Sequence, residues 1–210
     1  MDTSGGLSFA ELLAQPGVTE HHELRSSFGF LAYHGGALER VTSMIAVGAA
    51  SKADATVYTV EQPEERPLHI PSIRVQPDES AALARVYAHT HTVCTIHGYG
   101  REMDKQHVLL GGQNRELAEH VAGHLRVHLH ERYEVVTDLE AIPQELRGLH
   151  PRNPVNLGAN KGVQIELPPA VRWNFAARAW ADEPGTEPTN DVLATIEALA
   201  EAASGWDVDG

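Results

Sequence analysis

One stretch decides the fold of this chain: Phe28-Gly-Phe-Leu-Ala-Tyr-His-Gly-Gly-Ala-Leu-Glu39. Its first part, residues 28–33, is apolar without a helical period and runs into His34-Gly-Gly, so we predict a buried strand that ends in a turn. Residues 38–50 then carry apolar side chains at helical spacing. The stretch therefore predicts a strand, a loop and a helix, with His34 at the end of the strand and Glu39 in the first turn of the helix.

Strands and helices alternate along the rest of the chain. We predict further strands at residues 56–60, 69–73, 91–96, 108–110, 133–137 and 163–167, and helices at residues 7–15, 80–87 and 115–131. Such alternation is typical of an α/β domain whose mixed, mostly parallel sheet is covered by helices on both faces. We place this single domain at residues 1–180, a linker-like segment rich in Pro, Gly and acidic residues at 181–190, and a C-terminal helix with an acidic tail at 191–210.

The composition argues against several classes of protein. The 210 residues carry a formal net charge of −13, which argues against nucleic-acid binding because that draws on clustered Lys and Arg. No apolar run approaches the roughly 20 residues that span a bilayer, so we expect no membrane insertion. A single cysteine, Cys94, excludes an intrachain disulfide and a Cys-rich zinc module. The 13 histidines are the unusual feature, because histidine is the commonest metal ligand.

Three predicted strands end in residues that carry chemistry: His34, His97 and Glu166. In α/β sheets the ligand site lies beyond the carboxyl ends of the strands, so we expect these side chains to meet there. His34, Glu39 and His97 supply two nitrogens and a carboxylate, which leaves the fourth position of a zinc ion open for water. Glu166 stands among Val, Ile and Leu, where desolvation raises the pKa of a carboxyl toward the range of a general base. Each residue alone is typical of a structural role, but together they predict a zinc hydrolase.

A second group of histidines forms a competing metal site. His120, His124 and His128 recur every four residues on the predicted 115–131 helix, and His130 follows. Adjacent pairs at this spacing can chelate a metal. The stripe has no glutamate between its histidines in the arrangement of helical zinc proteases. We therefore interpret it as a mostly solvated face and keep the metal site as an alternative.

Six motifs follow one another in the order of a known family. They are His34-Gly-Gly-Ala-Leu-Glu39, Leu68-His-Ile-Pro-Ser72, Thr95-Ile-His-Gly-Tyr99, Leu110-Gly-Gly112, Pro151-Arg-Asn-Pro-Val-Asn156 and Gly162-Val-Gln-Ile-Glu-Leu-Pro168. Together, over residues 7–172, they resemble the phage-type poly-γ-glutamate hydrolase family, which has a carboxypeptidase-A-like zinc peptidase fold. The resemblance implies hydrolysis of γ-glutamyl amide bonds with one Zn²⁺ per chain. His34, Glu39 and His97 match the zinc ligands, and Glu166 matches the base.

The resemblance also implies residues that handle the substrate. The candidates are Arg152, Asn153, Asn156 and Tyr99 for substrate binding, and Arg101 and Arg172 for polarising the scissile carbonyl or binding a second carboxylate. The Arg152-Asn153 pair matches one that grips a carboxylate, a task suited to a guanidinium because it can donate two parallel hydrogen bonds.

Two departures from the family pattern bear on the substrate. Leu157 stands where an arginine is expected, and Pro71 stands where a threonine is expected. The missing basic residue weakens the case for a polyanionic substrate. A related zinc amidase acting on a small N-acylated or cell-wall peptide therefore stays open, as does a non-catalytic module that retains the fold.

The location and partners of the protein are predicted on the same basis. The N-terminus lacks the basic and apolar regions of a signal peptide, so we expect a cytoplasmic or phage-encoded protein. We expect it to be a monomer whose partner is a peptide or a polyanionic γ-glutamyl substrate.

Overall fold

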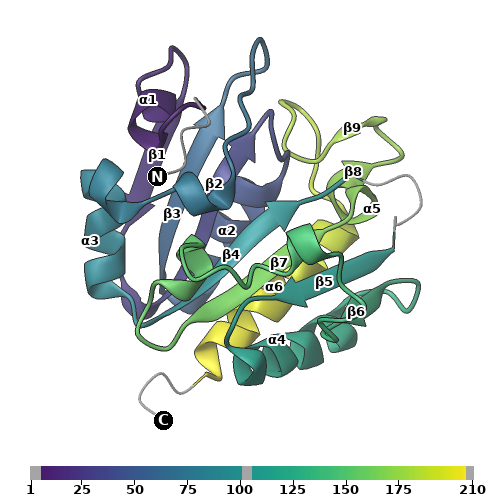
Figure 1. Cartoon of the computed structure of the whole chain (residues 1–210). Coiled ribbons are helices and arrows are strands. Elements are labelled where there is room, and N and C mark those ends of the chain that lie inside the picture. Colours follow the sequence, from purple (N-terminus) through teal and green to yellow (C-terminus); the bar gives the residue numbers. More distant parts are fainter. Residues whose placement is uncertain (1–5, 101–105, 207–210) are drawn as a thin grey trace.

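The computed structural model describes residues 6–100 and 106–206 and is built around a seven-stranded sheet in the order β1-β3-β2-β4-β7-β5-β6 (Figure 1). The strands are β1 (Thr19–Glu23), β2 (Ser26–Gly36), β3 (Ala55–Gln62), β4 (Thr92–Gly98), β5 (His107–Gly111), β6 (Glu134–Val136) and β7 (Gly162–Leu167). The pairs β2–β3, β2–β4, β4–β7 and β5–β6 are parallel, whereas β1–β3 and β5–β7 are antiparallel. The predicted mixed, mostly parallel sheet is confirmed.

Helices cover both faces of this sheet, as predicted (Figure 1). One face packs against α2 (Thr42–Ala53), α4 (Arg115–His128) and α6 (Asn190–Ser204), and the other packs against α1 (Phe9–Leu13) and α3 (Ala81–His89). Successive side chains of a strand point to opposite faces. Phe30 and Ala32 of β2 therefore join the first core, while Leu31 and Tyr33 join the second. Among the described residues, no helix is both long and apolar enough to cross a bilayer.

The C-terminal part of the chain packs with the sheet rather than extending from it. α6 contributes Val192 and Leu199 to the core that it shares with α2 and α4. Asp182, which precedes α6, accepts hydrogen bonds from Nε of Arg40 at 2.9 Å and from the backbone N–H of Val41 at 2.6 Å. These contacts fix the segment before α6 against the loop that follows β2.

The remaining elements are short. They are the 3₁₀ turns η1 (Ser72–Arg74), η2 (Pro77–Glu79), η3 (Gln144–Leu146) and η4 (Pro154–Asn156), the helical turn α5 (Pro169–Arg172), and the hairpin of β8 (Trp173–Asn174) and β9 (Ala179–Trp180). Two of them, η3 and η4, belong to the long connection between β6 and β7, which contributes residues to the cavity described below.

Two local predictions are wrong, and one strand of the main sheet is missed. Residues 69–73 form no strand but lead into η1, because Pro71 removes a backbone donor that a strand ladder needs. α2 begins at Thr42, so Glu39 lies in the loop before the helix and not in its first turn. β1 was not predicted, because this mostly exposed edge strand reads Thr-Glu-His-His-Glu and has no apolar alternation.

Candidate metal centre

An irregularity in β2 creates one wall of the site. Ala32 pairs with Thr59 and Gly35 with Glu61, so β2 holds one residue more than β3 over this interval. Tyr33 and His34 are consecutive, and in a regular strand they would point to opposite faces. Here their rings lie 5.1 Å apart in an edge-on contact. The extra residue thus lets both side chains face the same side, as bulges commonly do near functional sites.

The turn after His34 requires its second glycine. Gly36 has a φ of 67°, and a Cβ there would lie 2.4 Å from the carbonyl oxygen of Gln62. Both the left-handed backbone conformation of Gly36 and the close approach to the Gln62 carbonyl exclude a side chain at this position. The turn closes with a hydrogen bond of 2.9 Å from the N–H of Glu39 to the carbonyl of His34, which returns Glu39 to the strand end.

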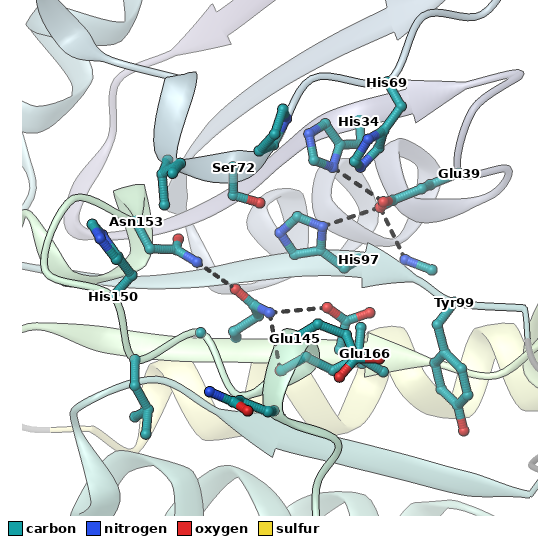
Figure 2. Close-up of a pocket in the computed structure, with 18 of the residues that line it drawn as sticks. His34, Glu39, His69, Ser72, His97, Tyr99, Glu145, His150, Asn153 and Glu166 are labelled. Carbon is teal, nitrogen blue, oxygen red and sulfur yellow. Dashed lines mark hydrogen bonds and ion pairs between the residues drawn. The ribbon is translucent and has the colours of Figure 1, made fainter. Parts of the chain in front are cut away.

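The Glu39 carboxylate lies between two histidines (Figure 2). Its Oε1 is 3.1 Å from Nδ1 of His34, and its Oε2 is 3.1 Å from Nδ1 of His97. The backbone N–H of Gly98 also donates to Oε2 at 3.0 Å. Burial opposes ionisation of Glu39, but the charges of His97 and His34 and their hydrogen bonds hold the pKa of this carboxyl well below its ordinary value.

Glu166 lies beside this cluster because of strand register. β4 and β7 are parallel, and His97 and Glu166 are directly paired between them. Paired residues project to the same face, so the carboxyl of Glu166 shares the site with the imidazole of His97. Glu166 is only 4% exposed. Burial raises its pKa to about 7, with the His97 charge opposing the rise and the Glu39 charge adding to it.

The cluster opens into a cavity of about 630 Å³ that also contains groups not predicted from the sequence. The cavity lining includes His69, Ser72, Glu145 and His150. The ring of His69 is 5.4 Å from that of His34. His69 lies within a family motif and could have been singled out, but the loop positions 145 and 150 follow no periodic pattern. Among the described lining residues there is no Lys or Arg.

The structure places two of the proposed substrate residues at the cavity wall. Asn153 is buried there, and its amide bonds to other buried side chains. Tyr99 also lines the cavity, but its hydroxyl points away from His34, Glu39 and His97 in Figure 2 and donates to the carbonyl of His107 at 2.6 Å.

The other proposed substrate residues lie outside this lining. Arg152 is exposed and donates to the carbonyl of Ile73 at 3.3 Å. Asn156 is buried within its own loop, where Nδ2 donates to the carbonyls of Gly148 and His150. Arg101 lies outside the described residues.

Arg172 is not among the residues that line the cavity. Its guanidinium is buried and donates to the carbonyls of Leu167, Arg40 and Tyr99 at 3.3, 3.0 and 2.9 Å. These three carbonyls follow Glu166, Glu39 and His97 by one or two residues. One side chain therefore connects the segments that carry Glu166, Glu39 and His97.

The histidines of α4 are half-buried and bond to α6, so the predicted mostly solvated face is partly covered. His124 and His128 contact Oε2 of Glu201 at 3.3 and 2.8 Å, and His120 Nε2 contacts the carbonyl of Ala202 at 2.9 Å. In the part of the chain that the structure describes, His34, Glu39 and His97 are the group whose ligand atoms lie close enough together, within 4.8 Å, to hold a metal ion.

Comparison with known proteins decides the family. A family model described as poly-gamma-glutamate hydrolase matches residues 7–196. The chain belongs to the poly-γ-glutamate hydrolase family. The resemblance carried by the six sequence motifs is thereby confirmed.

Two solved structures share the fold of this chain over nearly its whole length. The structure of a bacteriophage poly-γ-glutamate hydrolase is 22% identical, with a TM-score of 0.72 and 91% of each chain covered. A structure of YndL in a zinc-free apo form is 19% identical, with a TM-score of 0.75, and covers 95% of this chain and 97% of its own. The comparison with curated proteins gave no match.

The three clustered side chains fit a zinc ion. Zinc favours nitrogen and carboxylate ligands, and a hydrolytic site uses three of them. Ligand atoms that share one tetrahedral zinc lie about 3.4 Å apart, from the usual bond lengths. The two histidine nitrogens already lie 3.1 Å from separate oxygens of Glu39, and the cluster opens into the cavity.

Proposed function

We propose that this family member is a zinc-dependent hydrolase of γ-glutamyl amide bonds, with poly-γ-glutamate as its substrate class. His34, Glu39 and His97 would hold the ion, and Glu166 would be the general base. The observation that supports this most is the in-register pairing of Glu166 with His97, beside a carboxylate that already bridges two imidazole nitrogens. When bound, zinc supplies Lewis acidity: it acidifies water and polarises a carbonyl oxygen.

The chain's own residues then move the proton and shape the site. Glu166 takes a proton from the attacking water on its carboxylate and later gives it to the leaving amine. A carboxyl with a pKa of about 7 suits both steps near neutral pH. Arg172 already donates to three backbone carbonyls, so we assign it the positioning of the segments that carry Glu166, Glu39 and His97, in place of direct contact with the substrate.

One observation favours a different substrate for the same chemistry. Among the described residues, the cavity lining holds no Lys or Arg. A chain of net charge −13 has no general attraction for a polyanion either. These features favour the second candidate, a zinc amidase acting on a small or weakly charged N-acylated peptide. The family membership favours the first.

Metal content and hydrolysis measured together test the proposal. Wild type, His34→Ala and His69→Ala are purified, their zinc is counted, and their hydrolysis of poly-γ-glutamate is assayed. His69 lines the same cavity but is not among the proposed ligands, so His69→Ala is the matched control. We expect one zinc per chain in wild type and His69→Ala, and neither zinc nor activity in His34→Ala.

The other outcomes separate the alternatives. Zinc lost from His34→Ala, with a wild type that cleaves neutral N-acyl peptides but not poly-γ-glutamate, would support the second candidate. Zinc in a wild type that cleaves neither substrate would support a non-catalytic module. Full zinc in His34→Ala would overturn the assigned ligands.

A further inference from the structure

A row of buried polar side chains joins the metal cluster to Glu166. Nε2 of His97 lies 3.1 Å from the hydroxyl of Tyr33, which lies 3.4 Å from Oδ1 of Asn153. Nδ2 of Asn153 then donates to Oε1 of Gln164 at 2.9 Å. Finally, Nε2 of Gln164 donates to Oε1 of Glu166 at 2.9 Å. Figure 2 shows the last two links crossing the wall of the cavity below His97.

Two backbone groups fix the direction of this row. The N–H of Val155 donates to Oδ1 of Asn153 at 3.2 Å, so that atom must be the amide oxygen. At the other end, Nε2 of Gln164 donates to the carbonyl of Leu146 at 3.1 Å, so that atom must be the amide nitrogen. Each amide therefore has one orientation. In that orientation its oxygen accepts a hydrogen bond from the preceding residue of the row, and its nitrogen donates to the next residue toward Glu166.

The same reasoning settles the proton on His97. Oδ1 of Asn153 can only accept, so the Tyr33 hydroxyl donates its single proton to it. The Tyr33 oxygen is then left to accept, and Nε2 of His97 must carry the hydrogen that it accepts. A proton on Nε2 leaves Nδ1, which lies 3.1 Å from Oε2 of Glu39, as the nitrogen that would bind a metal.

We propose that Tyr33, Asn153 and Gln164 are positioning residues that form a one-way hydrogen-bond chain, setting the metal-binding tautomer of His97 and the orientation of Glu166 together. The inference rests on the proposed function and deepens it. It also gives Asn153 a role other than gripping the substrate, because both ends of its amide are used inside the protein. Groups that orient a metal-binding histidine typically change metal affinity or activity by 10–100-fold when removed.

The first test is the zinc affinity of Tyr33→Phe, measured by competition with a chromophoric chelator. Phenylalanine keeps the ring, which packs edge-on against His34 and His97, and removes only the hydroxyl. The matched control is Tyr87→Phe, which removes a hydroxyl that donates to the carbonyl of Pro154 at 2.7 Å and is outside the chain. We expect the zinc Kd to rise roughly 10–100-fold in Tyr33→Phe and less than about 2-fold in Tyr87→Phe.

Asn153→Asp tests the other end of the hydrogen-bond chain. It also provides a second test if Tyr33→Phe does not fold. An aspartate still accepts from Tyr33, but its second oxygen would face Oε1 of Gln164 and turn the Gln164 amide, so that Glu166 loses its donor. We expect zinc affinity to be retained while kcat falls roughly tenfold with KM little changed.

The outcomes separate the proposed hydrogen-bond chain from the proposed function. Equal zinc Kd values in wild type and Tyr33→Phe, or an unchanged kcat in Asn153→Asp, would overturn the chain and leave the zinc hydrolase intact. A wild type that binds no zinc would overturn both.

Discussion

Glu166 lies directly opposite His97 in the parallel ladder between β7 and β4. The proposed base and a proposed metal ligand are thus held by adjacent strands, and their separation depends on backbone hydrogen bonds rather than on a loop. A site built on strands is held more firmly than one built on loops. Of the other two proposed ligands, His34 lies within the bulge of β2 and Glu39 follows it, so the sheet itself positions most of the proposed site.

Replacing Glu166 should stabilise the metal-free protein at high pH. Burial raises the folded-state pKa of Glu166 to about 7 from an ordinary value of 4.5, so the carboxyl favours folding when protonated and disfavours it when ionised. This contribution is fully present below pH 4.5 and is lost as the pH rises through about 7. We expect chelator-treated Glu166→Gln to exceed wild type by about 1–3 kcal/mol at pH 8 in urea unfolding. The difference should shrink toward pH 4, and a constant difference across this range would contradict the shifted pKa.

Gly36→Ala should destabilise the fold. The left-handed backbone at Gly36 and the close approach to Gln62 both exclude a Cβ, so we expect a loss of at least about 2 kcal/mol in unfolding free energy. Gly123→Ala in α4 is the matched control, because a Cβ there meets no other atom within 4 Å. A helical alanine should stabilise by up to about 1 kcal/mol. Equal effects of the two substitutions would refute the requirement for glycine in the turn.

Arg172→Met should weaken both stability and metal binding. Methionine has a similar length but removes a donor from three carbonyls, of which that of Leu167 keeps the N–H of Tyr99 at 3.2 Å, so we expect a loss of about 2–5 kcal/mol. Because those carbonyls belong to the segments that carry Glu39, His97 and Glu166, the zinc Kd should rise as well. Chelator competition at a temperature where the variant remains folded measures this. Unchanged affinity would show that Arg172 supports the fold alone.

Arg152→Ala tests a substrate role that the fold leaves open. The side chain is exposed and bonds only to the carbonyl of Ile73 among the described contacts, so its removal should cost little stability. If it grips a substrate carboxylate, KM for poly-γ-glutamate should rise about tenfold or more with kcat unchanged, and the rise should shrink at high salt. An unchanged KM would favour the weakly charged substrate.

The sequence predicted the residues that end apolar strands and missed those that depend on long-range packing. His34, His97 and Glu166 were found because each terminates or interrupts a run of apolar residues, and parallel strands bring such ends together. Gln164 lies in the same strand as Glu166 and reads as an ordinary polar position. Its importance depends on Asn153, which reaches it from η4, a turn without periodic signal. The predicted strand at residues 69–73 does not form, because Pro71 lacks the backbone N–H that a strand ladder needs although its neighbours are apolar.

In the proposed site His34, Glu39 and His97 hold zinc, while Glu166 only moves the proton. Glu166→Gln tests this division of roles most directly. Zinc stoichiometry and the turnover of poly-γ-glutamate, or of whichever amide the wild type cleaves, are measured side by side for the variant and wild type. We predict one zinc per chain in both proteins and a turnover lower by roughly 10²–10⁴-fold in the variant. A variant that retains near wild-type turnover, or one that loses its zinc, would contradict this division of roles.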